Sequence, residues 1–271
     1  MSPDISTLTD TADGREDSTD TRERLIVAGM EVFAERGFAD ASVRQICKHA
    51  GANTAAVNYH FGDKQSFYAE VLATCHLRAV RRRPLPRLAD DPDHPERVLG
   101  AFIRWFLELL IVDGAGPLGR LMAREMADPT PALDQLTRRS LLPIMVNLQE
   151  ILVALTPDWP LRRRFLVQKS IMGQCLFYRF TQPAMDRFRA VVDEGGTASM
   201  PPGLMAKPDL PELSRHITEF SLAGIRAVGS SPGEDSDTAS RDGAPRDSTS
   251  RDSTSRDSSS RDNPSQEDVT P

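Results

Sequence analysis

Six consecutive residues, Thr54 to Tyr59, combine small side chains with hydrogen-bonding groups at helical spacing. Small residues allow a helix backbone to approach another surface closely, while Thr54, Asn58 and Tyr59 carry groups that donate or accept hydrogen bonds. The major groove of B-DNA is about 12 Å wide, admits one α-helix and exposes the donors and acceptors of the base edges. Val57 would anchor such a helix to an apolar core. This stretch therefore predicts a helix that contacts DNA bases.

Two short helices joined by a tight turn are predicted to hold this stretch in place. The first begins at Ser42, where the residues Ser-Val-Arg-Gln form a capping box. Gly51 can adopt the positive φ that the turn needs, and Asn53 can cap the second helix. A helix over residues 21–36 precedes this pair, and another runs from residue 63 to about residue 83. The pattern is typical of a helix-turn-helix.

The chain beyond this motif also shows helical periodicity, and no alternating pattern typical of strands competes with it. Pro84 and Pro86 mark the junction to a second domain, and Pro143 should kink the helix that contains it. The expected fold is all-α, with an N-terminal three-helix helix-turn-helix domain followed by a helical C-terminal domain. The further helices are expected at about 95–112, 117–128, 131–155, 160–182, 184–192 and 209–228.

Both ends of the chain lack the apolar residues that a folded core requires. Residues 1–20 are rich in Asp, Thr and Ser, and residues 230–271 contain one large apolar residue, Val269. The C-terminal segment repeats five-residue units that open with Arg-Asp, a period that matches neither strand nor helix. We expect both tails to be disordered. The predicted divisions are a tail at 1–20, a DNA-binding domain at 21–83, a helical domain at 84–228 and a tail at 229–271.

The formal net charge of −6 combines two acidic ends with a basic segment between them. Residues 1–20 and residues 229–271 each carry a net charge of −5, which leaves +4 for residues 21–228. The segment 21–83 by itself also carries +4. A positively charged domain can attract phosphate even though the whole chain is acidic.

Several other classes of protein are disfavoured by the sequence. It contains no P-loop and no H-E-x-x-H motif, and its five histidines are scattered without paired carboxylates. The three cysteines form no C-x-x-C pair and are expected to be reduced and buried. No apolar run reaches the roughly 18 residues of a membrane span, and the polar N-terminus does not resemble a signal peptide. We expect a cytoplasmic protein without enzymatic activity, cofactor, metal site or membrane partner.

The stretch from Thr21 to Leu72 resembles the DNA-binding domain of TetR-family regulators. The match runs in order and at the family's spacing through the whole stretch, which makes it far more specific than a lone helix-turn-helix. The residues that carry it are Ala28, Phe33, Gly37, Phe38, Ser42, Val43, Ile46, Ala50, Gly51, Asn58, Tyr59, His60, Phe61 and Lys64.

The second domain narrows this resemblance to the CecR-like branch of the family. The resemblance covers roughly residues 21–226 and leaves out both tails. It implies a repressor that binds a palindromic DNA operator as a homodimer and is released by a small molecule. The alternative is a regulator that acts without a ligand, recruits a protein partner or activates transcription. The narrower match consists of Arg124-Glu125-Met126 with Pro129 and Pro131, and of the run from Gly173 to Phe180.

The resemblance also assigns roles within the helix-turn-helix. The start of the second helix is expected to meet phosphate, the outer face of the recognition helix to meet base edges, and the residues after it to meet the DNA backbone. The expected contacts are Ser42 and Arg44 to phosphate, Thr54, Ala55 and Asn58 to bases, and Tyr59, His60 and Lys64 to the backbone. Alternatively, His60 could cap the helix, Tyr59 could belong to the core and Arg44 could be a solvated charge.

A dimer interface and a site for an unknown inducer are implied for the second domain. The candidate interface consists of apolar stripes on the last two long helices, although their spacing equally suits an internal core. The stripes contain Phe165, Gln168, Lys169, Met172 and Leu176, and Leu213, Ile217, Phe220, Leu222 and Ile225. The candidate ligand residues combine apolar walls with a few polar groups, although each could instead be core. They are Trp105, Met122, Glu125, Met126, Gln174, Cys175, Tyr178 and Arg179.

Overall fold

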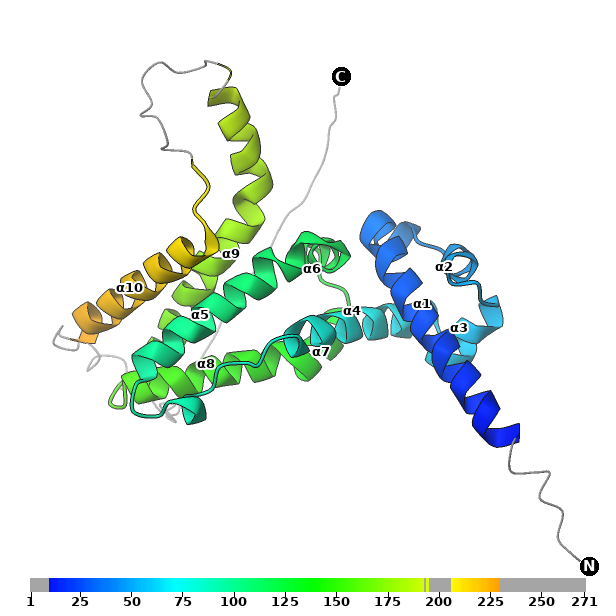
Figure 1. Ribbon diagram of the computed structural model, residues 1–271, viewed down its shortest axis with the longest axis horizontal. Helices are drawn as coiled ribbons and strands as arrows, with labels where there is room; N and C mark the ends of the chain where they lie inside the picture. The colour runs from blue at the N-terminus through cyan, green and yellow to red at the C-terminus, as the bar shows by residue number, and fades with distance from the viewer. Residues whose placement is uncertain (1–9, 193, 195–205, 230–271) are drawn as a thin grey trace, which may run out of the picture. The chain divides into compact units, whose positions relative to one another are not determined.

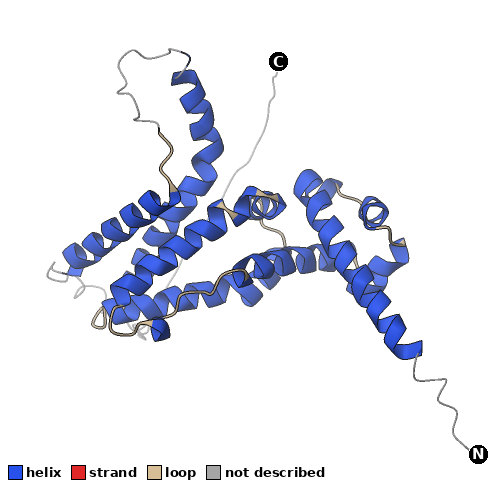
Figure 2. Cartoon of the chain, in the orientation of Figure 1, coloured by secondary structure: helices blue, strands red, loops and turns tan. Residues whose placement is uncertain are grey.

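The computed structural model describes residues 10–192, 194 and 206–229, and all regular structure within those ranges is helical (Figures 1 and 2). The expected all-α fold is therefore confirmed for this part of the chain. Residues 1–9 and 230–271, which belong to the predicted disordered tails, lie outside the described residues. None of the described helices combines the length and the apolar character that crossing a membrane requires.

The first four helices are α1 (Asp10–Asp40), α2 (Val43–Ala50), α3 (Thr54–Phe61) and α4 (Lys64–Arg81). The start of α1 corrects the expectation that residues 10–20 belong to a disordered tail, because the helix begins at Asp10 and not at Thr21. Acidic residues are favourable near a helix N-terminus, and this segment is rich in them. Asp20 also pairs with Arg24 one turn later, with 3.2 Å between the carboxylate oxygen and Nε.

The last turn of α1 follows a sharp bend at Gly37. This residue has a φ of 80° and a ψ of 175°, so the regular helix is interrupted there and one more turn leads to Asp40. Glycine is favoured at such a positive φ because it has no Cβ. A Cβ at Gly37 would also lie 2.6 Å from a guanidinium nitrogen of Arg124. The regular helix thus stops at Gly37, as predicted, but the chain bends there and forms one further turn.

The turn between α2 and α3 has the geometry predicted from the sequence. Ser42 and Gln45 form a reciprocal capping box, in which each side chain accepts the backbone N–H of the other residue. Gly51 ends α2 with a φ of 62°, in the left-handed region. The side chain of Asn53 accepts the N–H of Ala55 at 3.0 Å and caps α3. The local hydrogen bonds predicted for both helix ends are thus present in the turn.

The second domain contains six α-helices within the described ranges. The predicted helix at 131–155 is divided, because a π-helical segment, Thr137–Leu141, precedes the helix that contains Pro143. The predicted helices at 160–182 and 184–192 are instead one helix that continues through Pro183. A hydrogen bond from Gln182 to Asp186 spans the proline, and Arg189 donates to the same carboxylate. The helices are α5 (Pro95–Ile111), α6 (Pro117–Ala127), α7 (Ala132–Leu136), α8 (Leu142–Leu155), α9 (Leu161–Val191) and α10 (Leu210–Gly229).

Helix α4 contributes buried residues both to the core of the first four helices and to that of the second domain. Its buried residues Phe67 and Tyr68 contact Phe33 of α1, with ring centroids 5.7 and 4.9 Å apart. Farther along, α4 packs against α7 and the π-helical segment. Complete burial of a large apolar side chain contributes about 1.5–3 kcal/mol, so these contacts hold α4 firmly to both sets of helices. Helix α4 therefore packs against α1 and also against helices of the second domain.

Candidate functional site

The outer face of α3 presents the residues predicted to contact bases. Val57 is completely buried, whereas Thr54, Ala55 and Asn58 are exposed. Tyr59 is 81% exposed, so it does not belong to the core. Because α3 is eight residues long and buries only Val57, most of its surface is available to enter a groove.

Ser42 and Arg44 lie at the N-terminal end of α2 and are both exposed. The Ser42 hydroxyl oxygen accepts the Gln45 N–H at 3.2 Å, which leaves its own hydrogen available to another acceptor. No carboxylate of the described residues pairs with Arg44. A hydroxyl, a guanidinium and a helix N-terminus at one place suit a phosphate group.

His60 and Lys64 make contacts within the protein. The His60 ring is half-buried and packs edge-on against Tyr59 with centroids 4.9 Å apart. Burial, together with the nearby charge of Arg22, lowers the pKa of His60 below its ordinary value. The ammonium group of Lys64 donates to the carbonyl oxygen of Ala39 at 3.2 Å and lies 4.7 Å from the centre of the Phe38 ring. These two residues position α3 and the start of α4, and any DNA contact would be additional.

Glu70 of α4 joins the two domains through hydrogen bonds that the sequence did not reveal. Its carboxylate accepts from Arg22 of α1 at 2.7 Å, from Gln135 of α7 at 2.9 Å and from Arg139 of the π-helical segment at 2.6 Å. Burial raises the pKa of Glu70, but the hydrogen bonds from Arg139 and Arg22 outweigh that effect, so the pKa lies below its ordinary value. The ionised carboxylate thus connects α1, α4 and α7.

Glu125 forms a second connection between the domains. It is 1% exposed and accepts hydrogen bonds from the Tyr68 hydroxyl at 2.8 Å and from the backbone N–H of Thr130 at 3.1 Å. Burial and the carboxylate of Glu125 together raise the pKa of Tyr68, which keeps the hydroxyl protonated as the donor. Arg124, next to it, instead donates to the carbonyl oxygen of Glu35 at 3.3 Å. Glu125 is therefore satisfied by internal partners.

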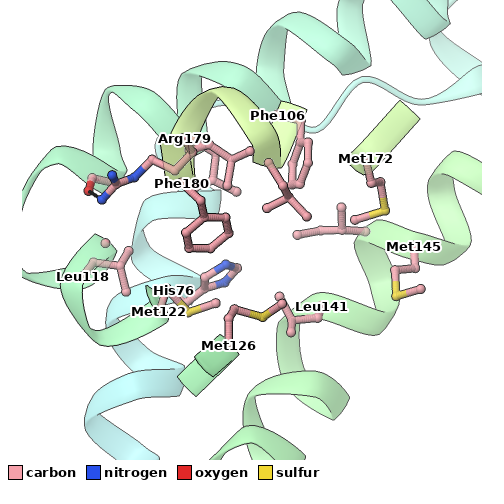
Figure 3. Close-up of a pocket in the computed structure, with 16 residues that line it drawn as sticks. His76, Phe106, Leu118, Met122, Met126, Leu141, Met145, Met172, Arg179 and Phe180 are labelled. Carbon is pink, nitrogen blue, oxygen red and sulfur yellow. Dashed lines mark hydrogen bonds between the residues drawn. The ribbon is translucent and has the colours of Figure 1, made fainter. Parts of the chain in front are cut away.

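A cavity of about 230 Å³ opens between α4, α5, α6, α8 and α9 (Figure 3). Its walls are almost wholly apolar and include four methionines, whose flexible thioethers adapt to ligands of different shape. The lining residues are His76, Phe106, Leu109, Leu110, Gly114, Leu118, Gly119, Met122, Met126, Leu141, Ile144, Met145, Met172, Leu176, Arg179 and Phe180.

The eight predicted ligand residues are divided between this cavity and other environments. Met122, Met126 and Arg179 line the cavity. The other five do not: Trp105, Glu125 and Cys175 are buried elsewhere, Gln174 donates to the Ser170 carbonyl, and Tyr178 lines a different pocket beside α10. Burial raises the pKa of the Cys175 thiol to about 12, as befits a core cysteine.

Two polar side chains reach the cavity. His76 of α4 is 5% exposed, and its Nδ1 lies 2.8 Å from the hydroxyl oxygen of Ser140 in the π-helical segment. Burial lowers the pKa of His76 to about 4, so the imidazole is neutral at neutral pH. Arg179 of α9 donates to the carbonyl oxygen of Gly114 at 2.7 Å. His76 was missed from the sequence, although a histidine in the apolar stretch of a buried helix is a usable signal.

A short glycine pattern lies at the cavity wall. Residues 114–119 match G-x-G-x-x-G, the fingerprint of dinucleotide-binding loops. Here the pattern joins a short 3₁₀-helix, Asp113–Ala115, to α6, whereas the fingerprint requires a preceding strand. Gly119 serves close packing instead, since a Cβ there would lie 1.7 Å from the carbonyl oxygen of Gly114.

The surface of α9 and α10 corrects the predicted interface stripes. Gln168, Leu213, Ile217 and Ile225 are at most 7% exposed within one chain, so this part of the predicted stripe is internal. Phe165, Lys169 and Phe220 of the predicted stripes are exposed, whereas Met172, Leu176 and Leu222 are half-buried. Phe220 belongs to an exposed face of these two packed helices. Its exposed members are Leu166, Gly173, Phe177 and Phe188 on α9, and Phe220, Ala223, Gly224 and Ala227 on α10.

Comparison with known protein families identifies both domains. Residues 25–71 match the family described as bacterial regulatory proteins, tetR family. Residues 95–225 match the C-terminal domain of the HTH-type transcriptional dual regulator CecR. The two matches therefore cover the helix-turn-helix and nearly the whole of the second domain.

Individual relatives are transcriptional regulators of bacteria. The HTH-type transcriptional dual regulator CecR of Shigella flexneri is 27% identical over 168 residues, which cover 58% of this chain and 75% of that protein. The HTH-type transcriptional regulator SrpR of Pseudomonas putida is 40% identical over 58 residues, which cover 21% of this chain and 27% of that protein.

Solved structures share the fold. HlyIIR, a hemolysin II transcriptional regulator, has a TM-score of 0.51 at 20% identity, covering 75% of this chain and 97% of that one. The flavonoid-responsive regulator FrrA has a TM-score of 0.52 at 16% identity, covering 77% of this chain and 96% of that one. With the exposed recognition helix and the matches to both domains, the chain belongs to the TetR family of DNA-binding transcriptional regulators, in its CecR-like branch.

Proposed function

We propose that the protein is a homodimeric repressor that binds an inverted-repeat operator and is released from it by a small molecule. The observation that carries this proposal is the pairing of an exposed α3 with an apolar cavity whose wall includes α4, the next helix in the chain. A cavity suited to a small molecule favours this function over regulation without a ligand. Because its partner would be chromosomal DNA, we place the protein in the cytoplasm.

DNA contacts are proposed for all eight residues predicted from the sequence. Thr54, Ala55 and Asn58 would face base edges, with Asn58 suited to adenine. The phosphate contacts would come from Ser42 and Arg44. Tyr59 is exposed enough to reach the DNA backbone. His60 and Lys64 would contact the backbone while keeping their contacts with Tyr59 and with the Ala39 carbonyl oxygen.

Dimerisation is proposed through the exposed face of α9 and α10. Phe177 and Phe220 are 57% and 62% exposed, and such large aromatic side chains are typical anchors of interfaces. Gly173 and Gly224 leave open space beside them, because a Cβ at either position would meet no atom within 4 Å. Two copies of this face would form a four-helix interface. The resulting pair of α3 helices could read consecutive turns of one side of the duplex.

The effect of a ligand would pass from the cavity to α3 through α4. His76 of α4 and Leu141 of the π-helical segment both line the cavity. The same two elements are joined by a contact between His76 and Ser140 and by a hydrogen bond from Arg139 to Glu70 of α4. A ligand that favoured another position of the π-helical segment would therefore move α4 and, through it, α3. Operator DNA would instead favour the position that the π-helical segment has without the ligand. A coupling of about 1–3 kcal/mol would weaken DNA binding roughly 5- to 150-fold.

The experiment for this function is the substitution Asn58→Ala, measured on an operator obtained by selection from randomised duplex DNA. We expect the specific affinity to fall by about 1–3 kcal/mol, because the side chain would lose its hydrogen bonds to one base pair. Binding to unrelated DNA should remain unchanged, with the same dependence on salt. Fluorescence anisotropy of labelled duplexes at several salt concentrations provides both values.

Arg44→Ala is the matched control for this measurement. As a phosphate contact, it should weaken binding to specific and unrelated DNA alike and reduce the salt dependence by about one counterion. If Asn58→Ala and Arg44→Ala changed binding to both kinds of DNA in the same way, α3 would not be the element that recognises sequence, and the proposal would fail.

A further inference from the structure

We propose that the cavity binds a compact aromatic carboxylate, whose anionic group is held by His76 and Arg179. The inference rests on the proposed function only in taking this cavity as the effector site. It adds the chemical class of the ligand, which follows from three features of the cavity: the size of its apolar part, the unpaired nitrogen of His76 and the unneutralised charge of Arg179.

The apolar part of the cavity limits the size of the ligand. An apolar cavity of about 150 Å³ holds one benzene molecule. With about 230 Å³, this cavity has room for one or two rings and a small substituent. Phe106, Phe180 and the four methionines provide aromatic and thioether surfaces that suit an aromatic ring.

His76 offers the cavity a hydrogen-bonding atom. Figure 3 shows its ring among the side chains from α6 and α9, pointing into the space between them. Nδ1 is occupied by Ser140, whereas Nε2 has no hydrogen-bond partner in the described part of the chain. The residue is 95% buried, as its exposure of 5% implies. Nε2 is not among the fully buried unpaired atoms of the described residues, so it is accessible from the cavity that His76 lines. It is therefore available to pair with a polar atom of a ligand.

The surroundings of Ser140 favour the tautomer in which Nε2 is the donor. Ser140 is 2% exposed, and its hydroxyl has no hydrogen-bond partner other than His76 among the described residues. A buried hydroxyl that leaves its hydrogen unpaired is penalised, so Ser140 donates and Nδ1 accepts. The proton of the neutral imidazole then lies on Nε2. The ligand atom facing Nε2 must therefore be an acceptor, such as a carboxylate, carbonyl or hydroxyl oxygen. The charge of Arg179 decides among these.

Arg179 of α9 adds a positive charge to the lining of the cavity. Its guanidinium donates to the Gly114 carbonyl oxygen, and no carboxylate of the described residues lies within salt-bridge distance of it. The residues that line the cavity include no Asp or Glu. A cavity with one guanidinium, one N–H donor and no acid is complementary to an anion. Arg and His side chains together favour a carboxylate over a neutral carbonyl compound.

The test compares two probes that differ in charge and are alike in their rings. Isothermal titration calorimetry of the full chain would use 2-naphthoate and its neutral counterpart 2-naphthylmethanol. We expect 2-naphthoate to bind about ten-fold or more tightly than the alcohol, because a hydrogen bond to a charged group discriminates at that level. Equal binding of the two probes, or no binding of 2-naphthoate at about 1 mM, would overturn the proposal.

Variants then locate the preference. His76→Asn keeps an acceptor for Ser140 but removes the Nε2 donor, and Arg179→Gln removes the charge. Each should reduce the preference for 2-naphthoate about five-fold or more, whereas Arg179→Lys should retain most of it. Met145→Leu is the matched control in the apolar wall and should affect both probes alike. A preference that survived both His76→Asn and Arg179→Gln would contradict the assignment.

Failure of this inference is distinguishable from failure of the proposed function. DNA binding without any probe is measured separately, on the selected operator. Loss of sequence-specific DNA binding by a protein that still prefers 2-naphthoate would refute the regulator and leave the carboxylate site standing. An operator-binding protein without the preference would refute the carboxylate site alone.

Discussion

Phe220→Asp is expected to convert the protein into a monomer and to reduce its affinity for the operator by about 10³-fold or more. In the proposed dimer, Phe220 would be covered by the partner, so an aspartate would bury an unpaired charge twice, once for each copy. A single α3 reads only a few base pairs, and specific sites bind typically 10³- to 10⁷-fold more tightly than unrelated DNA when both halves are engaged. Loss of the partner should therefore remove most of the specificity.

The measurement combines sedimentation velocity with anisotropy titrations on the selected operator. Because Phe220 is 62% exposed in one chain, the fold of each monomer should survive the substitution. Val27→Asp serves as the matched control, since Val27 is 43% exposed but lies on α1, outside the proposed interface. A Phe220→Asp protein that remained dimeric would exclude this face as the interface, whatever its DNA affinity.

Gly119→Ala should lower the free energy of unfolding by about 3 kcal/mol, near the upper end for an added methyl group in a packed core. The new Cβ would lie 1.7 Å from the carbonyl oxygen of Gly114 and 2.6 Å from a guanidinium nitrogen of Arg179. The first of these neighbours is backbone, so the 3₁₀-helix Asp113–Ala115 must move. Since Gly114 and Arg179 line the cavity, the substitution should also deform the ligand site.

Thermal unfolding at one fixed protein concentration provides the comparison. A loss of about 3 kcal/mol corresponds to roughly 6–12 °C for a folded region of this size. Gly116→Ala is the matched control, because a Cβ there meets no atom within 4 Å and its φ is −93°. It should change the melting temperature little. Equal melting temperatures for Gly119→Ala and Gly116→Ala would show that the close packing at Gly119 does not constrain the fold.

The helix-turn-helix could be predicted almost completely because its signals are local. The capping box at Ser42, the cap at Asn53 and the glycine of the turn each act within four residues, and the structure has all three. The exposure of α3 also follows from local composition, since Val57 is its one fully buried side chain. Short-range hydrogen bonds are visible in a single sequence.

The cavity could not be predicted in the same way, because its members come from helices far apart in the chain. His76 lines the cavity, and its partner Ser140 lies 64 residues away in sequence. The buried pair of Tyr68 and Glu125, outside the cavity, is likewise 57 residues apart. Helical periodicity shows that one side of α9 is apolar, but it does not reveal whether Cys175 faces core or cavity. Glu125 is a candidate ligand residue from the sequence, but its partners Tyr68 and Thr130 are brought to it by the fold.

The most direct test of the central claim is selection of randomised duplex DNA by the purified full-length chain, followed by determination of the stoichiometry on the enriched sequence. The predicted result is an inverted repeat bound by two chains, with half-site centres about 34–36 Å apart or at a multiple of that distance. Enrichment of no sequence, or of a single site bound by one chain, would contradict the account of α3 as a symmetric pair of recognition helices.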